Sequence, residues 1–352
     1  MNASQAVTLV GDGIENPANA LTMIHAAAMF GAACRFRDTK GLAKSSAGAA
    51  GSGEMFNSIS ATEVQTLHSR LIAFDNLPGA RDVYGFPAGR DFAVLMGNER
   101  RGLSHEFTSL ATDRVQVPML SRRINCLNVA AASAVALYYL CAPPVGPMAV
   151  RKDPRSRRPE LLLLGAGDHY ELGSTIRSAA GLGWERAFLE DRNQVWFGCD
   201  RATRSEGRAA ARRGKNEILL IPCPTGAAYR YARVTIITHK PLGAPLRRAN
   251  LAGGPSQVIV IPDESRVETA SEDWSRFGRQ VEFAHLQLPA TDITYHYRLM
   301  ATIGLAEISR QVGRRPALRM PAAPRPPIYD HKLADLAKAT GEIVRWADLM
   351  NY

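Results

Sequence analysis

The chain has little that would mark a secreted or membrane-spanning protein. It contains only five cysteines, and no two of them are spaced as a CxxC pair. An odd number of thiols without that spacing argues against a disulfide framework and a zinc site, and is typical of reduced thiols in the cytoplasm, where we expect the protein to act. The longest apolar run, residues 129–141, is shorter than the ~20 residues that cross a bilayer. We therefore expect a buried helix there, no membrane partner, and no secretory leader at the N-terminus.

Acidic residues are also scarce relative to basic ones. The chain has 33 Asp+Glu against 43 Lys+Arg, which gives a formal net charge of +10. Such an excess favours a polyanionic partner, most simply nucleic acid, although charge alone does not distinguish RNA from DNA or from an acidic membrane. Composition excludes a disordered chain and a collagen-like chain. Because domains usually span about 100–200 residues, a length of 352 residues suggests two domains.

Short apolar runs alternate with longer segments of helical pattern through most of the chain. This alternation predicts an α/β fold with largely parallel sheets whose faces are covered by helices. The runs expected to form strands are residues 6–10, 92–96, 115–117, 161–164, 218–221, 234–237 and 258–261.

A proline-rich, basic stretch separates the two sets of strands. We therefore expect a first domain over residues 1–145, a linker over 146–160 and a second domain over 161–315. Residues 316–352 are expected to form a proline-rich segment followed by a C-terminal helix.

The two halves contain related segments. Residues 16–31 (NPANALTMIHAAAMFG) align with residues 170–183 (YELGSTIRSAAGLG) when their terminal glycines are superimposed. The alignment pairs His25 with Arg177, and Pro118 with Pro289 further along the chain. The pattern predicts two unequal copies of one domain.

Three segments of the first half carry the motifs of interest, beginning with residues 16–31. The second is VLMGNERRGLS, residues 94–104, in which Gly97 and Gly102 allow a tight turn after a buried strand. Glu99 lies in that turn, where its carboxylate could orient backbone or a substrate group. The third is VPMLSRRINCLNV and the alanine-rich helix that follows it, residues 117–140, whose N-terminal amides could bind polar ligand atoms.

In order and spacing these three segments resemble the SpoU/TrmH family of the SPOUT methyltransferases. The resemblance implies an enzyme that transfers a methyl group from S-adenosylmethionine to RNA, tRNA or rRNA, typically at a ribose 2′-hydroxyl. It also implies a trefoil-knotted cofactor pocket. Because protomers of the family pair, the two halves would form an intramolecular pseudo-dimer, and the chain could act as a monomer. The implied cofactor-binding residues are Met96, Gly97, Glu99, Gly102, Val117, Met119, Leu127 and Asn128.

The first half departs from the family pattern at positions expected to carry catalysis. Asn19 of the first motif is present, but Leu21 stands where the family has Gly and His25 where it has Arg. Cys126 replaces the serine that precedes Leu-Asn-Val. A histidine could itself act as a base near neutral pH, although a histidine on an alanine-rich helix is commonly structural.

The second half shows the complementary pattern. It keeps Gly173 and Arg177 of the first motif, with Glu171 at the Asn position, while VIVIPDESRVE replaces the glycine turn. We therefore hypothesise one composite site, in which the first half binds the cofactor and Arg177 reaches the acceptor; a surface arginine is the simpler alternative. The catalytic candidates are Asn19, Arg177, Glu99, Cys126 and His25.

Several arginines could contact RNA phosphates, since guanidinium groups bind phosphate in a bidentate manner. They are Arg100, Arg101, Arg122 and Arg123, with a further group in the alanine-rich segment around residue 210. Any one of these clusters could equally be a solvated face.

Other functions stay open. The substitutions Leu21, His25 and Cys126 are consistent with an RNA-binding protein that has lost catalysis, or with methylation of an acceptor other than ribose. Gly165-x-Gly167 resembles a dinucleotide fingerprint, but Tyr170 stands where the third glycine is required. No metal is expected.

Overall fold

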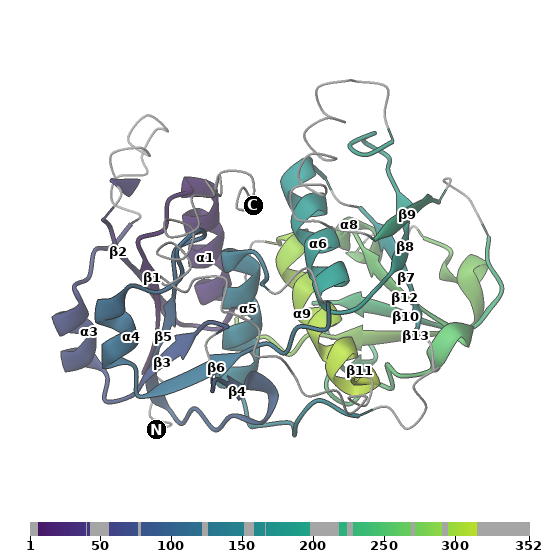
Figure 1. Cartoon of the computed structure of the whole chain (residues 1–352). Helices are drawn as coiled ribbons and strands as arrows, with labels where there is room; N and C mark the ends of the chain where they lie inside the picture. Colours follow the sequence, from purple (N-terminus) through teal and green to yellow (C-terminus); the bar gives the residue numbers. More distant parts are fainter. Residues whose placement is uncertain are drawn as a thin grey trace, which may run out of the picture. The chain divides into compact units, whose positions relative to one another are not determined.

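The fold comprises two α/β units. The computed structural model describes residues 6–39, 41–42, 56–76, 79–121, 126–150, 158–165, 167–197, 218–223, 228–268, 272–290 and 295–314. One unit contains the described residues up to Val117 together with Ala132–Pro144 (Figure 1). The other contains the described parts of Pro118–Ala131 and of the chain from Val145 onward. The predicted C-terminal helix and linker residues 151–157 lie outside the described residues.

The first unit is built on a six-stranded sheet in which every pair of neighbouring strands is parallel. Its strands follow the order β2-β1-β5-β3-β6-β4. Side chains on both faces of the central strands are buried, as a parallel sheet covered by helices requires. The strands are β1 (Ala6–Asp12), β2 (Ala33–Arg37), β3 (Leu71–Phe74), β4 (Arg81–Asp82), β5 (Asp91–Met96) and β6 (Asp113–Gln116).

Helices cover both faces of this sheet, and local sequence fixes where they begin. Asn16 caps the first helix by accepting a hydrogen bond from the Ala18 N–H. Pro17 occupies the first helical position, where the N–H that proline lacks would have no partner within the helix. Ser60 and Glu63 form a capping box on the next helix. The helices are α1 (Pro17–Met29), α3 (Ala61–Leu67), α4 (His105–Leu110) and α5 (Val129–Leu140), with a 3-10 turn at Val83–Gly85.

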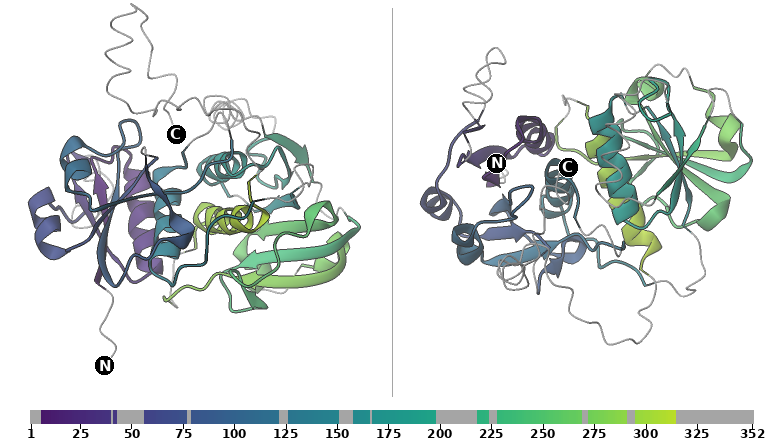
Figure 2. Two further views of the ribbon diagram at one scale, coloured as in Figure 1. Left: turned by 60° about the horizontal axis from the view of Figure 1, so that its bottom comes forward. Right: turned by 45° about the horizontal axis from the view of Figure 1, so that its top comes forward.

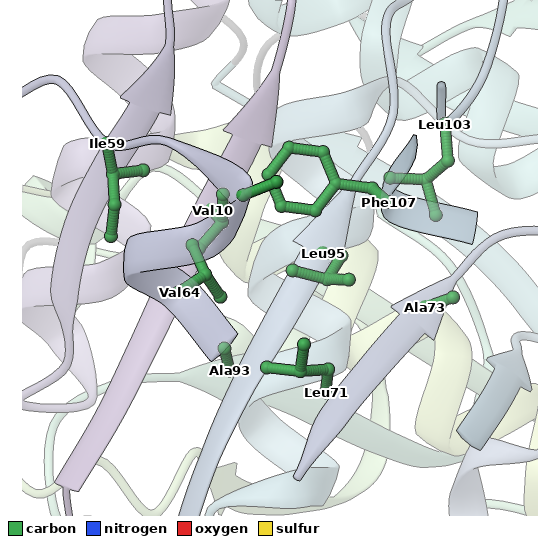
Figure 3. Packing of buried hydrophobic residues seen from close by; sticks show 10 residues of the cluster. Val10, Ile59, Val64, Leu71, Ala73, Ala93, Leu95, Leu103 and Phe107 are labelled. Atoms are coloured by element: carbon green, nitrogen blue, oxygen red, sulfur yellow. The ribbon is translucent and has the colours of Figure 1, made fainter. Parts of the chain in front are cut away.

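A hydrophobic cluster joins α3 and α4 to one face of the sheet. Phe107 of α4 and Val64 of α3 pack on Val10, Ala93 and Leu95 (Figure 3). The aromatic residues of α5 lie elsewhere in the unit: Tyr139 makes an edge-to-face contact with Tyr84 at 4.8 Å, and Tyr138 contacts Phe30 at 6.4 Å between ring centroids. Burial of such apolar surface contributes most of the free energy that stabilises the unit.

The second unit has a seven-stranded parallel sheet in the order β11-β13-β10-β12-β7-β8-β9. Two of its helices, α6 and α9, lie side by side, and the Ser178 and Thr302 hydroxyls hydrogen-bond at 2.9 Å between them (Figure 2). The strands are β7 (Glu160–Leu164), β8 (Arg186–Glu190), β9 (Leu219–Pro222), β10 (Tyr231–Thr238), β11 (Ala244–Pro245), β12 (Gln257–Pro262) and β13 (Gly278–His285). The helices are α6 (His169–Gly181), α8 (Glu264–Glu268) and α9 (Tyr297–Val312), with 3-10 turns at Gly254–Ser256 and Trp274–Phe277.

The two sheets correspond strand for strand. The order β2-β1-β5-β3-β6-β4 matches β8-β7-β12-β10-β13-β11, and β9 is an addition at the edge of the second sheet. In each unit the last strand in sequence lies between two strands that precede it. Helices α1 and α6, which carry the related segments, each follow the first strand of their sheet.

The predicted α/β fold with parallel sheets is therefore confirmed. The sequence pattern missed β2, β3, β8 and β13, and the two-residue strands β4 and β11. No helix within the described residues is long and apolar enough to cross a membrane.

Candidate functional site

Glu99 connects the glycine turn to the beginning of α1. Its Oε2 accepts a hydrogen bond from the Glu15 N–H at 3.0 Å, and its Oε1 accepts from the Asn16 N–H at 3.2 Å. Oε1 also accepts from the Asn19 side-chain amide at 3.0 Å. A carboxylate at a helix N-terminus satisfies N–H groups that have no partner within the helix. Glu99 therefore orients both the start of α1 and the Asn19 side chain.

The turn between Gly97 and Gly102 is closed by its own backbone. Asn98 and Gly102 exchange two backbone hydrogen bonds, at 2.9 and 3.0 Å. Gly102 has φ +69°, and a Cβ on Gly97 would lie 2.2 Å from the Gly102 carbonyl carbon. Both positions therefore require glycine, in agreement with the tight turn that the sequence indicates. Asn98 adds side-chain bonds to the N–H groups of Arg100 and Arg101, at 2.9 and 3.0 Å.

The third motif leads into α5. Asn128 caps that helix: its Oδ1 accepts from the Ala130 N–H at 3.0 Å and from the Ala131 N–H at 3.4 Å. Val117 is buried, and Met119 and Leu127 are half-buried. Arg122 and Arg123 lie outside the described residues, whereas Arg100 and Arg101 are exposed.

Arg177 and Cys126 are brought together within the second unit. The Arg177 Nη2 donates to the Cys126 sulfur at 2.7 Å, and Nε donates to the Cys126 carbonyl oxygen at 3.1 Å. The loop before Cys126 is also attached to α6, because the Leu120 N–H donates to the Gly181 carbonyl at 2.8 Å. Two directional bonds fix the plane of the guanidinium, which is half-buried.

His25 lies six residues beyond Asn19 on α1, nearly two turns further along the helix. Its ring is half-buried. Leu21 of the same helix is partly exposed. The contacts of Glu99 thus assemble Asn19, and not His25, with the glycine turn.

Two carboxylates at the ends of strands escaped the sequence analysis. Asp12 follows the apolar run of β1; its Oδ2 accepts from the Ser104 N–H at 2.7 Å, and Arg37 pairs with its Oδ1 at 2.9 Å. Asp75 follows β3 and accepts from the N–H groups of Asn76 at 2.7 Å and Leu103 at 3.4 Å. Burial raises the pKa of the Asp75 carboxyl above its usual value. A single Asp directly after an apolar run was the available signal, since ligands of parallel sheets bind at the carboxyl ends of strands.

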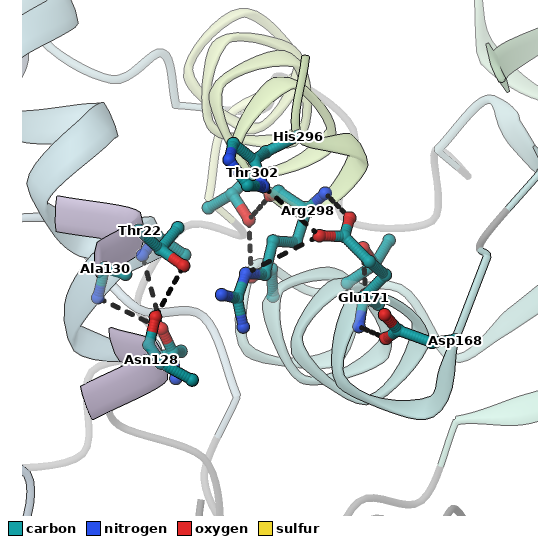
Figure 4. Close-up of polar contacts among 12 residues, drawn as sticks. Thr22, Asn128, Ala130, Asp168, Glu171, His296, Arg298 and Thr302 are labelled. Atoms are coloured by element: carbon teal, nitrogen blue, oxygen red, sulfur yellow. Dashed lines mark hydrogen bonds and ion pairs between the residues drawn. The ribbon is translucent and has the colours of Figure 1, made fainter. Parts of the chain in front are cut away.

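The corresponding edge of the second sheet is used differently. Glu171, at the position that Asn19 holds in the first unit, accepts from the Arg298 N–H at 2.6 Å, where α9 begins (Figure 4). The same carboxylate lies 3.8 Å from the Arg298 guanidinium and 3.7 Å from the His296 ring. After β12, α8 begins at Glu264, whose side chain accepts from Thr238 at 2.6 Å. Glu171 and Glu264 therefore serve contacts inside the second unit.

Comparisons with known proteins agree with the resemblance over residues 6–138. Residues 6–138 match the model of the SpoU rRNA Methylase family, which is less than half of the chain and contains the three motifs up to Tyr138. The resemblance is thereby confirmed for that region. No curated protein matches the chain.

Solved structures of SpoU-type enzymes are similar at low identity. The SpoU methyltransferase AviRb from Streptomyces viridochromogenes, in complex with AdoMet, is 22% identical over 40% of this chain and 58% of that chain, with a TM-score of 0.34. A structure described as giving insights into 2-OH methylation of C/U34 on tRNA is 23% identical over 39% and 90% of the chains, with a TM-score of 0.33. The TrmH/SpoU tRNA modifying enzyme of A. aeolicus is 16% identical over 39% and 74%, with a TM-score of 0.33. The match spans little more than half the length of AviRb.

Proposed function

We propose that this protein is an S-adenosylmethionine-dependent RNA methyltransferase that acts on a ribose 2′-hydroxyl of tRNA or rRNA. The observation that carries the proposal is the SpoU family match over residues 6–138. The bonded arrangement of Glu99, Asn19 and the Gly97–Gly102 turn supports it, because the motifs that define the match also form one connected structure. The chain's basic character suits an RNA substrate.

The residues present fit a cofactor of this kind. The cofactor would be held largely through backbone groups of Met96 at the end of β5, Gly97 directly after it, Val117 directly after β6, and Leu127 and Asn128 before α5. Asp75 offers a half-buried carboxylate at the same edge of the sheet, suited to the hydroxyl or ammonium groups of the cofactor. When bound, S-adenosylmethionine supplies an electrophilic methyl group.

Two side chains, Arg177 and Asn19, would act on the acceptor. Arg177, held by Cys126, would stabilise the negative charge that develops on the acceptor oxygen as its proton is lost to water. Asn19, held by Glu99, would hydrogen-bond the acceptor. Because Cys126 immediately precedes Leu127 and Asn128 in the chain, the contact between Arg177 and Cys126 links the arginine to a cofactor-binding segment. This supports one composite site per chain. The matching strand orders of the two units support descent from a fused pair of SPOUT domains.

A non-catalytic RNA-binding protein is the second candidate. The observation that favours it is the loss of the family's Arg and Gly from α1, where His25 and Leu21 stand. A methyltransferase for a non-ribose acceptor is compatible with the same loss.

Calorimetry with S-adenosylmethionine, followed by transfer of its radiolabelled methyl group to total cellular RNA, separates these functions. The proposal predicts binding at one site per chain and label at a ribose 2′-oxygen of one RNA class. Label on a base would indicate the non-ribose acceptor. Binding to RNA without binding to the cofactor would leave only the non-catalytic function.

A further inference from the structure

Helix α6 begins with an exposed tyrosine ring that lies against a half-buried histidine ring. Tyr170 is 48% exposed, although most large apolar side chains of the described residues are buried. The His169 ring lies against it, with 4.1 Å between ring centroids and 36° between ring planes. The Tyr170 ring, backed by His169, thus presents an aromatic surface to solvent at the first turn of the helix.

The exposed ring and Arg177 lie along one line of the helix. They are seven residues apart, which at 3.6 residues per turn places both side chains on nearly the same face, ~10 Å apart along the axis. The residues between them on that face are Gly173 and Ser174, so no large side chain intervenes. An aromatic plane and a guanidinium therefore face the same direction at a fixed separation.

This first turn of α6 is firmly held. Asp168 caps it by accepting from the Glu171 N–H at 2.8 Å. The Glu171 carboxylate bonds the beginning of α9 at 2.6 Å, and Ser178 bonds Thr302 further along. Tyr170 is consequently carried on a rigid element, which preorganises it relative to Arg177.

An exposed ring with a guanidinium ~10 Å further along the same helix face suits an unpaired base and the backbone of a nearby nucleotide. Bases stack on aromatic side chains irrespective of sequence, and guanidinium groups attract phosphate. The ~10 Å separation is about three times the 3.4 Å rise of stacked nucleotides. In a stacked strand, a base on Tyr170 therefore belongs to a nucleotide about three positions from the one whose ribose reaches Arg177.

We propose that Tyr170, backed by His169, is a stacking platform for an unpaired base of the RNA strand and positions the acceptor nucleotide at Arg177. The inference rests on the proposed methyltransferase function, of which it specifies the substrate: RNA that is single-stranded around the acceptor. Tyr170 is a positioning residue, because the reacting atoms are expected at Arg177.

Fluorescence anisotropy with a labelled single-stranded oligouridylate tests the platform. Tyr170→Ala is expected to weaken binding about tenfold, because the stacked plane is lost. Tyr170→Phe and Tyr170→Trp are expected to bind within about twofold of wild type, because they keep a plane. Leu219→Ala, at an exposed position on β9, is the matched control and should leave binding unchanged. A duplex of the same length should bind all variants equally.

Three outcomes would overturn the platform: wild-type oligouridylate binding by Tyr170→Ala, an equal loss in Tyr170→Phe, or an equal loss in Leu219→Ala. Calorimetry with S-adenosylmethionine on the same proteins separates this inference from the proposed function. Unchanged cofactor binding with weakened RNA binding in Tyr170→Ala supports the platform. A wild-type protein that binds no cofactor yet needs Tyr170 for oligouridylate would refute the enzyme and retain the platform.

Discussion

Arg177 donates one hydrogen bond to the sulfur of Cys126 at 2.7 Å and another to its carbonyl oxygen at 3.1 Å. The two residues are far apart in sequence, and Cys126 directly precedes the Leu-Asn-Val element. Arg177 of α6 is thus oriented by a residue of the third motif. Cys126 serves as an acceptor for the guanidinium through its sulfur and its carbonyl oxygen.

Replacing the sulfur tests this orientation. Cys126→Ser keeps an acceptor and is expected to retain activity. Cys126→Ala keeps only the carbonyl bond and is expected to lower kcat about tenfold, since a hydrogen bond to a charged group is lost. Steady-state kinetics with calorimetry of cofactor binding is the measurement. A Cys126→Ala enzyme with wild-type kcat would show that the sulfur contact does not position Arg177.

The glycine turn should tolerate no side chain. Gly97→Ala would put a Cβ 2.2 Å from the Gly102 carbonyl carbon, so the turn must open and cofactor binding should be lost. Gly31→Ala is the matched control: Gly31 has φ +65°, but nothing lies within 4 Å of the added Cβ. The control should cost about 1 kcal/mol of stability and leave the cofactor Kd unchanged. Wild-type cofactor affinity in Gly97→Ala would exclude the turn from the cofactor site.

Removing the carboxylate of Glu99 should loosen α1. Glu99→Gln leaves at most one oxygen acceptor for three donors, and we expect the free energy of unfolding to fall by about 1–3 kcal/mol. Arg100→Ala, at the adjacent exposed position, should change the free energy of unfolding by less than about 0.5 kcal/mol. Urea unfolding followed by circular dichroism measures both. Equal stabilities of the two variants would contradict the bracing role of Glu99.

Asp75 gives the first unit a definite pH dependence. Burial raises the pKa of its carboxyl above 3.8, so the folded state binds the proton more tightly than the unfolded state. Its contribution is therefore fully present below the unfolded pKa and is lost as pH rises through the raised folded pKa. Asp75→Asn has no carboxyl to ionise, so it avoids this loss of stability as pH rises. The Tm of the variant should therefore exceed that of wild type at neutral pH, and the two Tm values should converge in acid.

A control comes from Asp12, which is paired with Arg37. Asp12→Asn breaks this ion pair and should lower the Tm at neutral pH. Thermal unfolding of both variants between acid and neutral pH is the measurement. An Asp75→Asn protein that is less stable than wild type at neutral pH would show that the charged form of Asp75 is the one the fold requires.

Apolar continuity made several strands predictable, although β3 (Leu71–Phe74) is also a continuous buried run and was missed. Strands β1 and β5 are continuous apolar runs because both faces of the parallel sheet are covered. Strand β2 carries Arg35 and Arg37, and β13 contains Arg279, Gln280 and Glu282, so neither strand is a continuous apolar run. Patterns of this kind fit a loop or a helix equally well.

The parts of the candidate site that lie within one continuous segment could be predicted from the sequence. The turn at Gly97 and Gly102 follows from residue type and spacing, since both positions demand glycine. The contact of Arg177 with Cys126 joins distant segments, so only the fold brings them together. From the sequence, Tyr170 was notable only because it stands where a dinucleotide fingerprint requires its third glycine. Its exposure on α6 is visible only in the structure.

The central claim is that one site per chain transfers a methyl group to RNA with Arg177 at the acceptor. The most direct measurement is the rate of radiolabel transfer from S-adenosylmethionine to total cellular RNA by wild type and by Arg177→Ala, with cofactor binding measured on both. We predict that Arg177→Ala binds the cofactor as wild type does and loses about 100-fold or more in rate. Turnover by Arg177→Ala at the wild-type rate, with normal cofactor binding, would contradict the account.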